Sequence, residues 1–374
     1  QLTRERIYGD LWFRDIFRVY AEIFWASTFN QDLPPLVIDR NLGDFLNLFA
    51  DLKVAELYDH PVYFRGGRQE LLFGSQRLIS PLDWANTRRT FEGGRLFYRG
   101  DKWDVDAFVV SPVVPTVNHF FSSINANEVF SGAWATYRPK AGQALDAYYL
   151  NLDNTSGTPV TLGLPAGPYN VNTVGGRWVG DANNWTWDVE GDLQFGDFQQ
   201  RHILAKAFSA GAGYRFADLP MTPQLWAYYD YASGDPDPSN AHATYGTFNQ
   251  LFPFGHYYFG FLDLVGRQNI NDVNFQVSLF PTKWITTYLQ YHVFRLDSAK
   301  DALYNAAGTP IRRDPTGAAG NDVGDELDYV INFHIDKHQD VLFGYSHLFA
   351  GQFIRQTGNG RSPELTYLQY SFRW

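Results

Sequence analysis

The sequence predicts an all-β fold: a transmembrane, antiparallel, up-and-down β-barrel of about 18 strands, within a range of about 16 to 18. Three observations predict it. Apolar and polar residues alternate with a period of two along many segments, which is the pattern of a strand with two different faces. Short turns and long loops join these segments alternately. The chain closes on an alternating segment that ends in an aromatic residue.

The alternating segments occur along the whole chain, so we expect one domain over residues 1–374. In chain order they are 17–25, 46–54, 103–109, 185–195, 273–279, 289–293, 327–333 and 365–374. In the clearest one, apolar residues from Trp185 to Phe195 alternate with a polar set that contains Asp188, Glu190 and Asp192. A soluble β-sandwich has the same local pattern, so the number, length and uniformity of the strands decide in favour of the membrane.

The last segment, Leu365–Trp374, points to the same class of protein. Its one face carries Leu368, Tyr370, Phe372 and Trp374. It resembles the C-terminal strand of bacterial outer-membrane barrels, in which the terminal aromatic residue helps assembly.

Composition supports a membrane barrel. Aromatic residues make up 17% of the chain, which is typical of barrels with aromatic girdles at both interfaces. No stretch of about 18 apolar residues occurs, which excludes a transmembrane helix. The mean hydropathy of −0.31 is expected when half of each strand faces water. The net charge of −10 argues against nucleic acid as a partner. The absence of Cys suits passage through an oxidising periplasm.

The connections give a direction to the strands. Short ones are predicted at 99–102, 138–142, 180–183, 280–283 and 336–339, and long ones at 28–43, 75–87, 112–127, 153–170, 234–256 and 297–325. Long loops of such barrels lie outside the cell, so the last strand should descend to the periplasm. Counting back gives about 17 visible strands, and an even barrel needs another, either before Gln1 or within 257–268. No signal peptide is visible, which indicates a mature or truncated form.

Two neighbouring segments carry a family pattern. Residues 63–78 contain G-R-Q-E-L, G and R-L, and residues 83–96 contain D-W-x-N-T-x-R-x-F-x-G. This pattern resembles the alginate-export family of outer-membrane porins, and the segments around 248–253 and 301–306 are also similar to it. The resemblance implies a barrel of about 18 strands in a Gram-negative outer membrane, with a basic lumen that passes an anionic polysaccharide. It does not fix the substrate of this member.

Six arginines against two glutamates, Glu70 and Glu92, lie on two predicted strands and the loop that joins them. These arginines are Arg65, Arg68, Arg77, Arg88, Arg89 and Arg95. A charge on the lipid face costs about 2–4 kcal/mol at the bilayer midplane, so most of them should face the lumen. Strict alternation cannot place both Arg65 and Arg68 inside, so a bulge is expected at Gly66–Gly67.

We interpret these six residues, with Arg6, Arg18 and Arg177 on other polar faces, as a basic ladder that binds the substrate. An acidic wall of Asp188, Glu190 and Asp192 is expected to lie opposite and to set up a transverse field. The alternative stays open that arginines and acids in the lumen only pair with each other and stabilise a wet wall.

Other signals are weaker. The segment 235–240 resembles a calcium loop through Asp235 and Asp237, but it lacks Gly at the sixth position, so a solvated acidic loop is favoured and no metal or other cofactor is expected. His292 and His334 lie on polar faces, where lumen lining is favoured over a metal site. Arg312 and Arg313 either contact anionic lipopolysaccharide or form a solvated loop tip.

We therefore expect a passive outer-membrane channel for anionic solutes, with an alginate-like polysaccharide as one candidate. Outer-membrane lipid, lipopolysaccharide and a periplasmic or envelope component are the expected partners. A structural or glycan-binding barrel with a plugged lumen is the alternative, and a barrel hydrolase is less favoured. No G-x-S-x-G or H-E-x-x-H spacing occurs, so an enzyme is not expected.

Overall fold

The computed structural model describes residues 1–32, 34–155 and 167–374. The first strands are β1 (Leu2–Phe13), β2 (Phe17–Thr28), β3 (Asn41–Leu57), β4 (His60–Gln69), β5 (Phe91–Arg99), β6 (Trp103–Val114), β7 (Ser123–Ile124), β8 (Glu128–Tyr137), β9 (Gln143–Asn154) and β10 (Tyr169–Ala182). The others are β11 (Trp185–Phe198), β12 (Arg201–Arg215), β13 (Gln224–Ala232), β14 (Ile270–Thr282), β15 (Ile285–Arg295), β16 (Ala302–Tyr304), β17 (Pro310–Arg313), β18 (Asp322–His334), β19 (Gln339–Ala350) and β20 (Glu364–Phe372). The helices of these residues are short, α1 (Gly255–Tyr258) and α2 (Gln352–Gln356).

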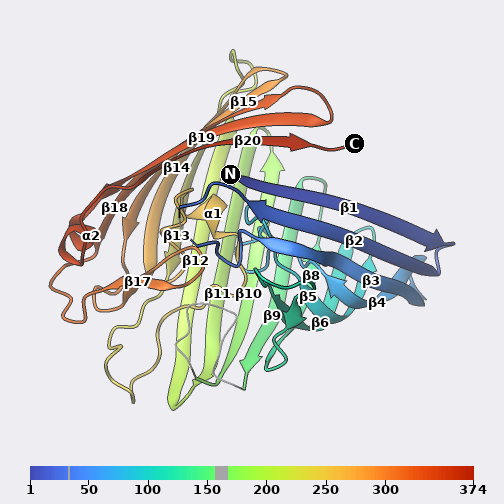
Figure 1. The fold of residues 1–374 in the computed structure, drawn as a ribbon, viewed down its shortest axis with the longest axis horizontal. Helices are drawn as coiled ribbons and strands as arrows, with labels where there is room; N and C mark the ends of the chain where they lie inside the picture. The colour runs from blue at the N-terminus through green and yellow to red at the C-terminus, as the bar shows by residue number, and fades with distance from the viewer. Residues whose placement is uncertain (33, 156–166) are drawn as a thin grey trace.

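One antiparallel sheet contains 18 of these strands. Each long strand pairs with the next long strand along the chain, from β1 with β2 to β19 with β20. The sheet curves round from β1 in blue, through β10 to β12 in green, to β20 in red (Figure 1). The predicted all-β, up-and-down architecture is confirmed. No helix among the described residues is long and apolar enough to cross a membrane.

The two edges of the sheet run in the same direction. Since β7 has only two residues and lies beside β6, the 18 strands comprise 17 long ones. Among the described residues, β1 pairs only with β2 and β20 only with β19. With an odd number of alternating strands, both edge strands begin on the long-loop side, so they cannot pair antiparallel with each other. The prediction of a strand within 257–268 is wrong, because this segment contains the end of α1 and irregular chain and no strand.

The two faces of the sheet differ as the period of two predicts. In β11, Asp188, Glu190 and Asp192 are buried on one face, whereas Leu193 and Phe195 are exposed on the other. We call the face with the buried polar residues the inner face. Strict alternation over 46–54 predicts Leu46 on the same face as Leu48, but Leu48 is exposed whereas Leu46 is buried with Phe24. The pairing of β2 with β3 shifts register between Glu22 and Ile23, and this irregularity turns Leu46 inward.

Short turns gather at one end of the sheet and most long loops at the other. The short turns include 100–102, 138–142, 183–184, 283–284 and 335–338, and the long loops include 29–40, 70–90, 115–127, 233–269, 296–321 and 351–363. The two-residue turn between β11 and β12 lies on the long-loop side. The loop 296–321 contains the β16–β17 hairpin. Most of the long loop predicted at 153–170 lies outside the described residues.

The hydrophobic core lies on the inner side of the sheet. Loop residues such as Phe73, Phe252 and Phe259 pack in one buried cluster with strand residues such as Phe91 and Phe130. Many large apolar side chains of the opposite face are exposed. Apolar loop residues are therefore buried on the inner side of the sheet, and the exposed apolar side chains of the outer face are suited to contact lipid.

Candidate functional site

The loop 70–90 crosses the space enclosed by the sheet, which we call the lumen. It leaves β4 and returns to β5, yet its Trp84 ring lies 5.1 Å from the Tyr367 ring on β20. Its Arg77 reaches β11, where Nη1 lies 2.9 Å from Oδ2 of Asp188. The loop therefore contacts the inner faces of strands that are far apart along the sheet.

A second loop, 233–269, packs against the first. The Tyr258 hydroxyl donates to the Ser75 carbonyl at 2.6 Å, and the Phe252 amide donates to the Leu78 carbonyl at 2.9 Å. We call 70–90 and 233–269 the lumenal loops. Together they narrow the channel between the long-loop end and the short-turn end.

Two buried arginines fasten these loops to the acidic face of β11. Arg77 Nη1 lies 2.9 Å from Asp188 and 3.3 Å from Glu190. Arg267 Nη1 lies 3.1 Å from Asp192. Burial by itself lowers the pKa of the Arg77 guanidinium, but the surrounding carboxylates outweigh burial and hold this pKa above its usual value. Both guanidinium groups stay charged and paired.

The surroundings of the predicted acidic wall differ from those expected. Asp188, Glu190 and Asp192 do share the inner face of β11, but Arg77 and Arg267 cover them from the loops. Arg177 is on the neighbouring strand β10 and donates to Asp188 at 2.7 Å. The acids are compensated where they lie, so they do not face the open lumen as an uncompensated wall.

Five predicted ladder residues lie on the inner side of the β1 to β6 part of the sheet, and we call them the arginine face: Arg6, Arg18, Arg65, Arg68 and Arg95. Each pairs with a carboxylate of the same wall, at 2.7 Å for Arg6–Glu22, 3.5 Å for Arg18–Asp51, 2.6 Å for Arg65–Asp51, 2.6 Å for Arg68–Asp44 and 2.7 Å for Arg95–Asp106. The sequence interpretation placed these arginines in the lumen but did not identify their carboxylate partners.

In each of these five pairs the carboxylate lies deeper than the arginine. The Arg6 side chain is 35% exposed against 2% for Glu22, and Arg65 is 14% exposed against 1% for Asp51. Hydrogen bonds hold these guanidinium groups against the wall, and in Arg68 all three nitrogens donate, to Glu92, Asp44 and the Ser122 carbonyl. Two further partners are more exposed than their arginines: Asp10, 2.8 Å from Arg18, at 32% against 20%, and Glu92, 2.6 Å from Arg68, at 38% against 10%.

Paired glycines let both Arg65 and Arg68 face the lumen. Gly67 of β4 lies opposite Gly93 of β5, and their φ angles are +129° and +153°. The register between the two strands is continuous here, so the bulge predicted at Gly66–Gly67 does not occur in this pairing. The change of face comes from a backbone conformation that L side chains rarely adopt.

The other predicted arginines belong to the lumenal loops. Arg88 pairs with Glu70 at 2.5 Å and also with Asp83. Arg89 donates to the carbonyls of Ser80 and Pro253, at 3.2 and 3.1 Å, and burial lowers its pKa to about 10. No carboxylate pairs with Arg89 in the described residues. Arg77, Arg88 and Arg89 therefore hold the loops rather than extend the arginine face.

The residues of the calcium-loop and histidine signals form ion pairs and hydrogen bonds with other side chains of the protein. Asp235 pairs with Arg201 at 2.6 Å, and Asp237 accepts a hydrogen bond from Asn240 at 3.1 Å. His292 pairs with Asp272 at 2.7 Å. No group of three or more His, Cys, Asp or Glu side chains suited to a metal occurs in residues 1–32, 34–155 and 167–374.

Comparison with known proteins agrees with this architecture. The model of the alginate export family matches residues 1–367. No curated protein matches the chain by sequence. Pseudomonas aeruginosa OpdK, solved with vanillate, is similar with a TM-score of 0.64 and 11% identity, over 99% of this chain and 92% of that one. Acinetobacter baumannii OccAB2 is similar with a TM-score of 0.60 and 10% identity, over 96% and 86%.

A third similar structure is Pseudomonas aeruginosa OccK3 (OpdO), with a TM-score of 0.58 and 12% identity, over 99% of this chain and 94% of that one. At these identities the structures show a shared fold, and the family match adds the class of protein. The chain therefore belongs to the alginate export family of outer-membrane channels.

Proposed function

We propose that the protein is a passive outer-membrane channel that selects anionic solutes at its arginine face. The observation that carries this proposal is the depth order of the ion pairs, in which the carboxylate lies below and the guanidinium faces the lumen. The buried acids stabilise the arginines in place, and a passing anion meets the positive groups first. Arginine suits this role because it stays charged and can bind a carboxylate with two parallel hydrogen bonds.

The arginine face also carries aromatic rings, which favours an acidic sugar chain as the substrate. Tyr20 and Phe49 stack at 5.2 Å between ring centroids. The Arg65 guanidinium lies 3.6 Å from the Phe49 centroid, and that of Arg18 lies 5.2 Å from the Tyr20 centroid. Phe49 is buried beneath Arg65, but Tyr20 is partly exposed, and a pyranose ring can pack on Tyr20 while its carboxylate binds an arginine. An alginate-like polyuronate combines both features.

The lumenal loops support a second candidate, a barrel whose lumen is plugged and whose loops bind glycans. Their apolar residues pack into the buried cluster, and Arg77 and Arg267 fasten them to β11. On this hypothesis the protein passes little current. The channel hypothesis requires an open path beside the loops, along β1 to β6.

Current block by oligosaccharides tests the proposal. Single channels in planar bilayers are exposed to a polyuronate oligomer and, separately, to a neutral oligomer of the same length. The channel proposal predicts that the uronate blocks the current at lower concentration, and that Arg65→Gln weakens its block while the neutral oligomer is unaffected. Equal block by both oligomers contradicts anion selection, and negligible conductance in every condition favours the plugged barrel.

A further inference from the structure

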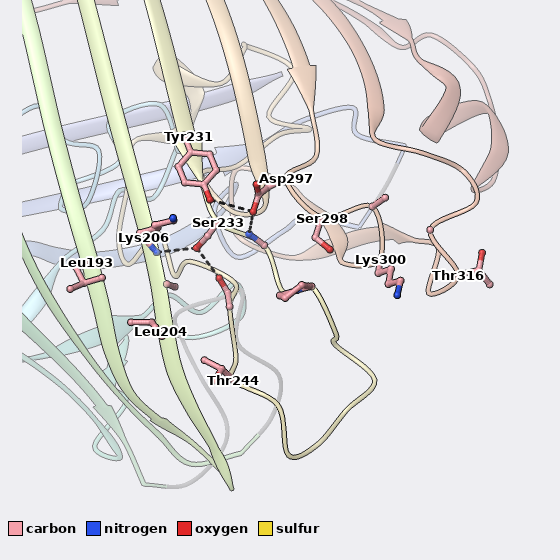
Figure 2. A pocket seen from close by; sticks show the side chains of 16 residues that line it. Leu193, Leu204, Lys206, Tyr231, Ser233, Thr244, Asp297, Ser298, Lys300 and Thr316 are labelled. Atoms are coloured by element: carbon pink, nitrogen blue, oxygen red, sulfur yellow. Dashed lines mark hydrogen bonds between the residues drawn. The ribbon is translucent and has the colours of Figure 1, made fainter.

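A cavity of about 740 Å³ opens on the outer side of the wall, where β11, β12 and β13 meet the long loops. Leu193, Leu204 and Lys206 line it from the strands, and Ser298 and Lys300 line it from the loop 296–321. Figure 2 shows these residues around one space, with the strands on one side and the loops on the other. The cavity is separate from the arginine face, which lies on the inner side of β1 to β6.

Lys206 belongs to the outer, lipid-facing surface. In β12 the exposed residues Leu204, Lys206 and Phe208 alternate with the buried residues Ala205 and Ala207. Lys206 lies opposite Leu193 in the pairing of β11 with β12. A lysine on this face costs about 2–4 kcal/mol at the bilayer midplane and about 0–1 kcal/mol near the interface. Its place near the loop end of β12 is therefore consistent with the head-group region.

The cavity has an excess of positive charge. Neither Lys206 nor Lys300 forms an ion pair with a carboxylate within the described part of the chain, and both side chains are exposed. The acidic residue of the lining, Asp297, accepts hydrogen bonds from the Gly234 amide at 2.9 Å and from the Tyr231 hydroxyl at 3.4 Å. The lining therefore contains two lysine ammonium groups and one carboxylate, and this carboxylate already accepts two hydrogen bonds.

We propose that this cavity binds lipid A, the doubly phosphorylated and acylated glucosamine disaccharide of the surrounding outer leaflet. The lysines come from two different elements, and each can contact a phosphate, while the Ser298 and Thr316 side chains also line the cavity. Leu193, Leu204 and Phe208 offer an exposed apolar surface to the acyl chains. The proposal rests on the outer-membrane location and on long loops that face the cell exterior. It does not depend on which solute the lumen selects.

Native mass spectrometry of the detergent-solubilised full-length protein tests the proposal. The probes are lipid A with two phosphates, its monophosphorylated form and phosphatidylethanolamine. We expect preference for the doubly phosphorylated form, and about tenfold weaker binding of it by a K206Q/K300Q variant. The matched control is a K140Q/K337Q variant, which removes two exposed lysines from the short-turn end, and its binding should equal that of the wild type.

The outcomes separate this site from the channel. Loss of lipid A binding with unchanged conductance and unchanged current block supports an independent lipid site. Equal binding by the wild type and K206Q/K300Q overturns the proposal, as does equal binding of lipid A and phosphatidylethanolamine by the wild type. If the double variant does not fold, Lys300→Gln alone changes only a loop residue, and the same two comparisons apply to it.

Discussion

Each residue of the arginine face pairs with a carboxylate that lies deeper in the wall than its guanidinium, and Arg18 also has a shorter pair with the more exposed Asp10. Arg65 and Arg18 share Asp51, whose side chain is 1% exposed. The total charge of the wall and the charge of its accessible surface are therefore different quantities, and a simple count of charges gives only the first. On the proposed function, the wall contains balanced charge while the part of it that meets the solute is mostly positive.

Neutralising the arginine and neutralising the carboxylate of one ion pair should therefore shift ion selectivity in opposite directions. A unit charge about 6 Å from the solute path contributes about 0.7 kcal/mol in water, so Arg65→Gln should lower the anion-to-cation permeability ratio about two- to threefold. Asp51→Asn keeps both arginines charged and should raise the ratio. Zero-current potentials in a salt gradient measure this. A fall in the ratio for both variants would count against the depth order as the cause.

Arg77 should control the lumenal loop rather than selectivity. Arg77→Gln leaves Glu190 and Asp230 without this cation, and breaking a buried pair of this kind costs about 3–5 kcal/mol. We expect loop 70–90 to detach from β11, which should raise the mean conductance and the current noise. Arg361→Gln, at an exposed position of the loop 351–363, is the matched control. Wild-type conductance and noise in Arg77→Gln would show that this anchor is dispensable.

The sequence predicted which arginines face inward and missed what they contact. The alternation of β2 and β4 places Arg18 and Arg65 on polar faces, and the structure has them there. The destination of Arg77 could not be predicted, because its partner Asp188 is 111 residues away and a loop has no periodic pattern that points to it. Arg267 was missed for the same reason.

At the scale of elements, a pair of glycines takes the place of the predicted bulge, at the point where the side chains of β4 and β5 switch from one face of the sheet to the other. Added to Gly67, a Cβ atom would lie 2.3 Å from the Leu48 carbonyl oxygen, and one added to Gly93 would lie 2.3 Å from that of Val109. Both close approaches involve backbone, which cannot swing aside. The glycine pair therefore fixes Arg65 and Arg68 on one face without a shift of register.

Gly67→Ala should destabilise the barrel, and Gly66→Ala should not. The φ of +129° at Gly67 is strained for alanine by about 1–3 kcal/mol, before the contact with Leu48 is counted. At Gly66 the nearest atom to an added Cβ belongs to the flexible Phe64 ring, at 3.4 Å. The temperature at which the folded form is lost on heat-modifiable gel migration compares the two variants. Equal temperatures would remove the backbone role assigned to Gly67.

The strands themselves were predictable because lipid on one face and water on the other impose the period of two. Leu46 shows the limit of this argument, since a shift in the pairing with β2 moves it to the inner face. The segment 257–268 shows another limit. Its apolar residues suggested a strand, but Phe259 and Val265 are buried in the hydrophobic cluster on the inner side of the sheet instead.

At the scale of the whole molecule, the parallel direction of β1 and β20 calls for one strand between them. A single strand antiparallel to both would satisfy both edges and give an even number. This strand would run from the short-turn end to the long-loop end, where β1 begins.

Cross-linking in a chain that has no natural cysteine tests the closing strand. With a strand between them, β1 and β20 lie about 9–10 Å apart, beyond the limit of about 7 Å for a disulfide. A Leu11→Cys, Phe372→Cys variant should therefore form no disulfide but should accept a linker of about 10 Å. Leu11→Cys, Val19→Cys is the positive control, because these residues are opposite partners in β1 and β2. Rapid disulfide formation between β1 and β20 would show that they are direct neighbours.

The central claim is that a chain with a net charge of −10 encloses a lumen whose accessible surface is positive. The zero-current potential of the wild-type protein in a potassium chloride gradient across a planar bilayer tests it most directly. The account predicts the sign of a channel more permeable to chloride than to potassium. A potential of the opposite sign, from a folded and conducting protein, would contradict it.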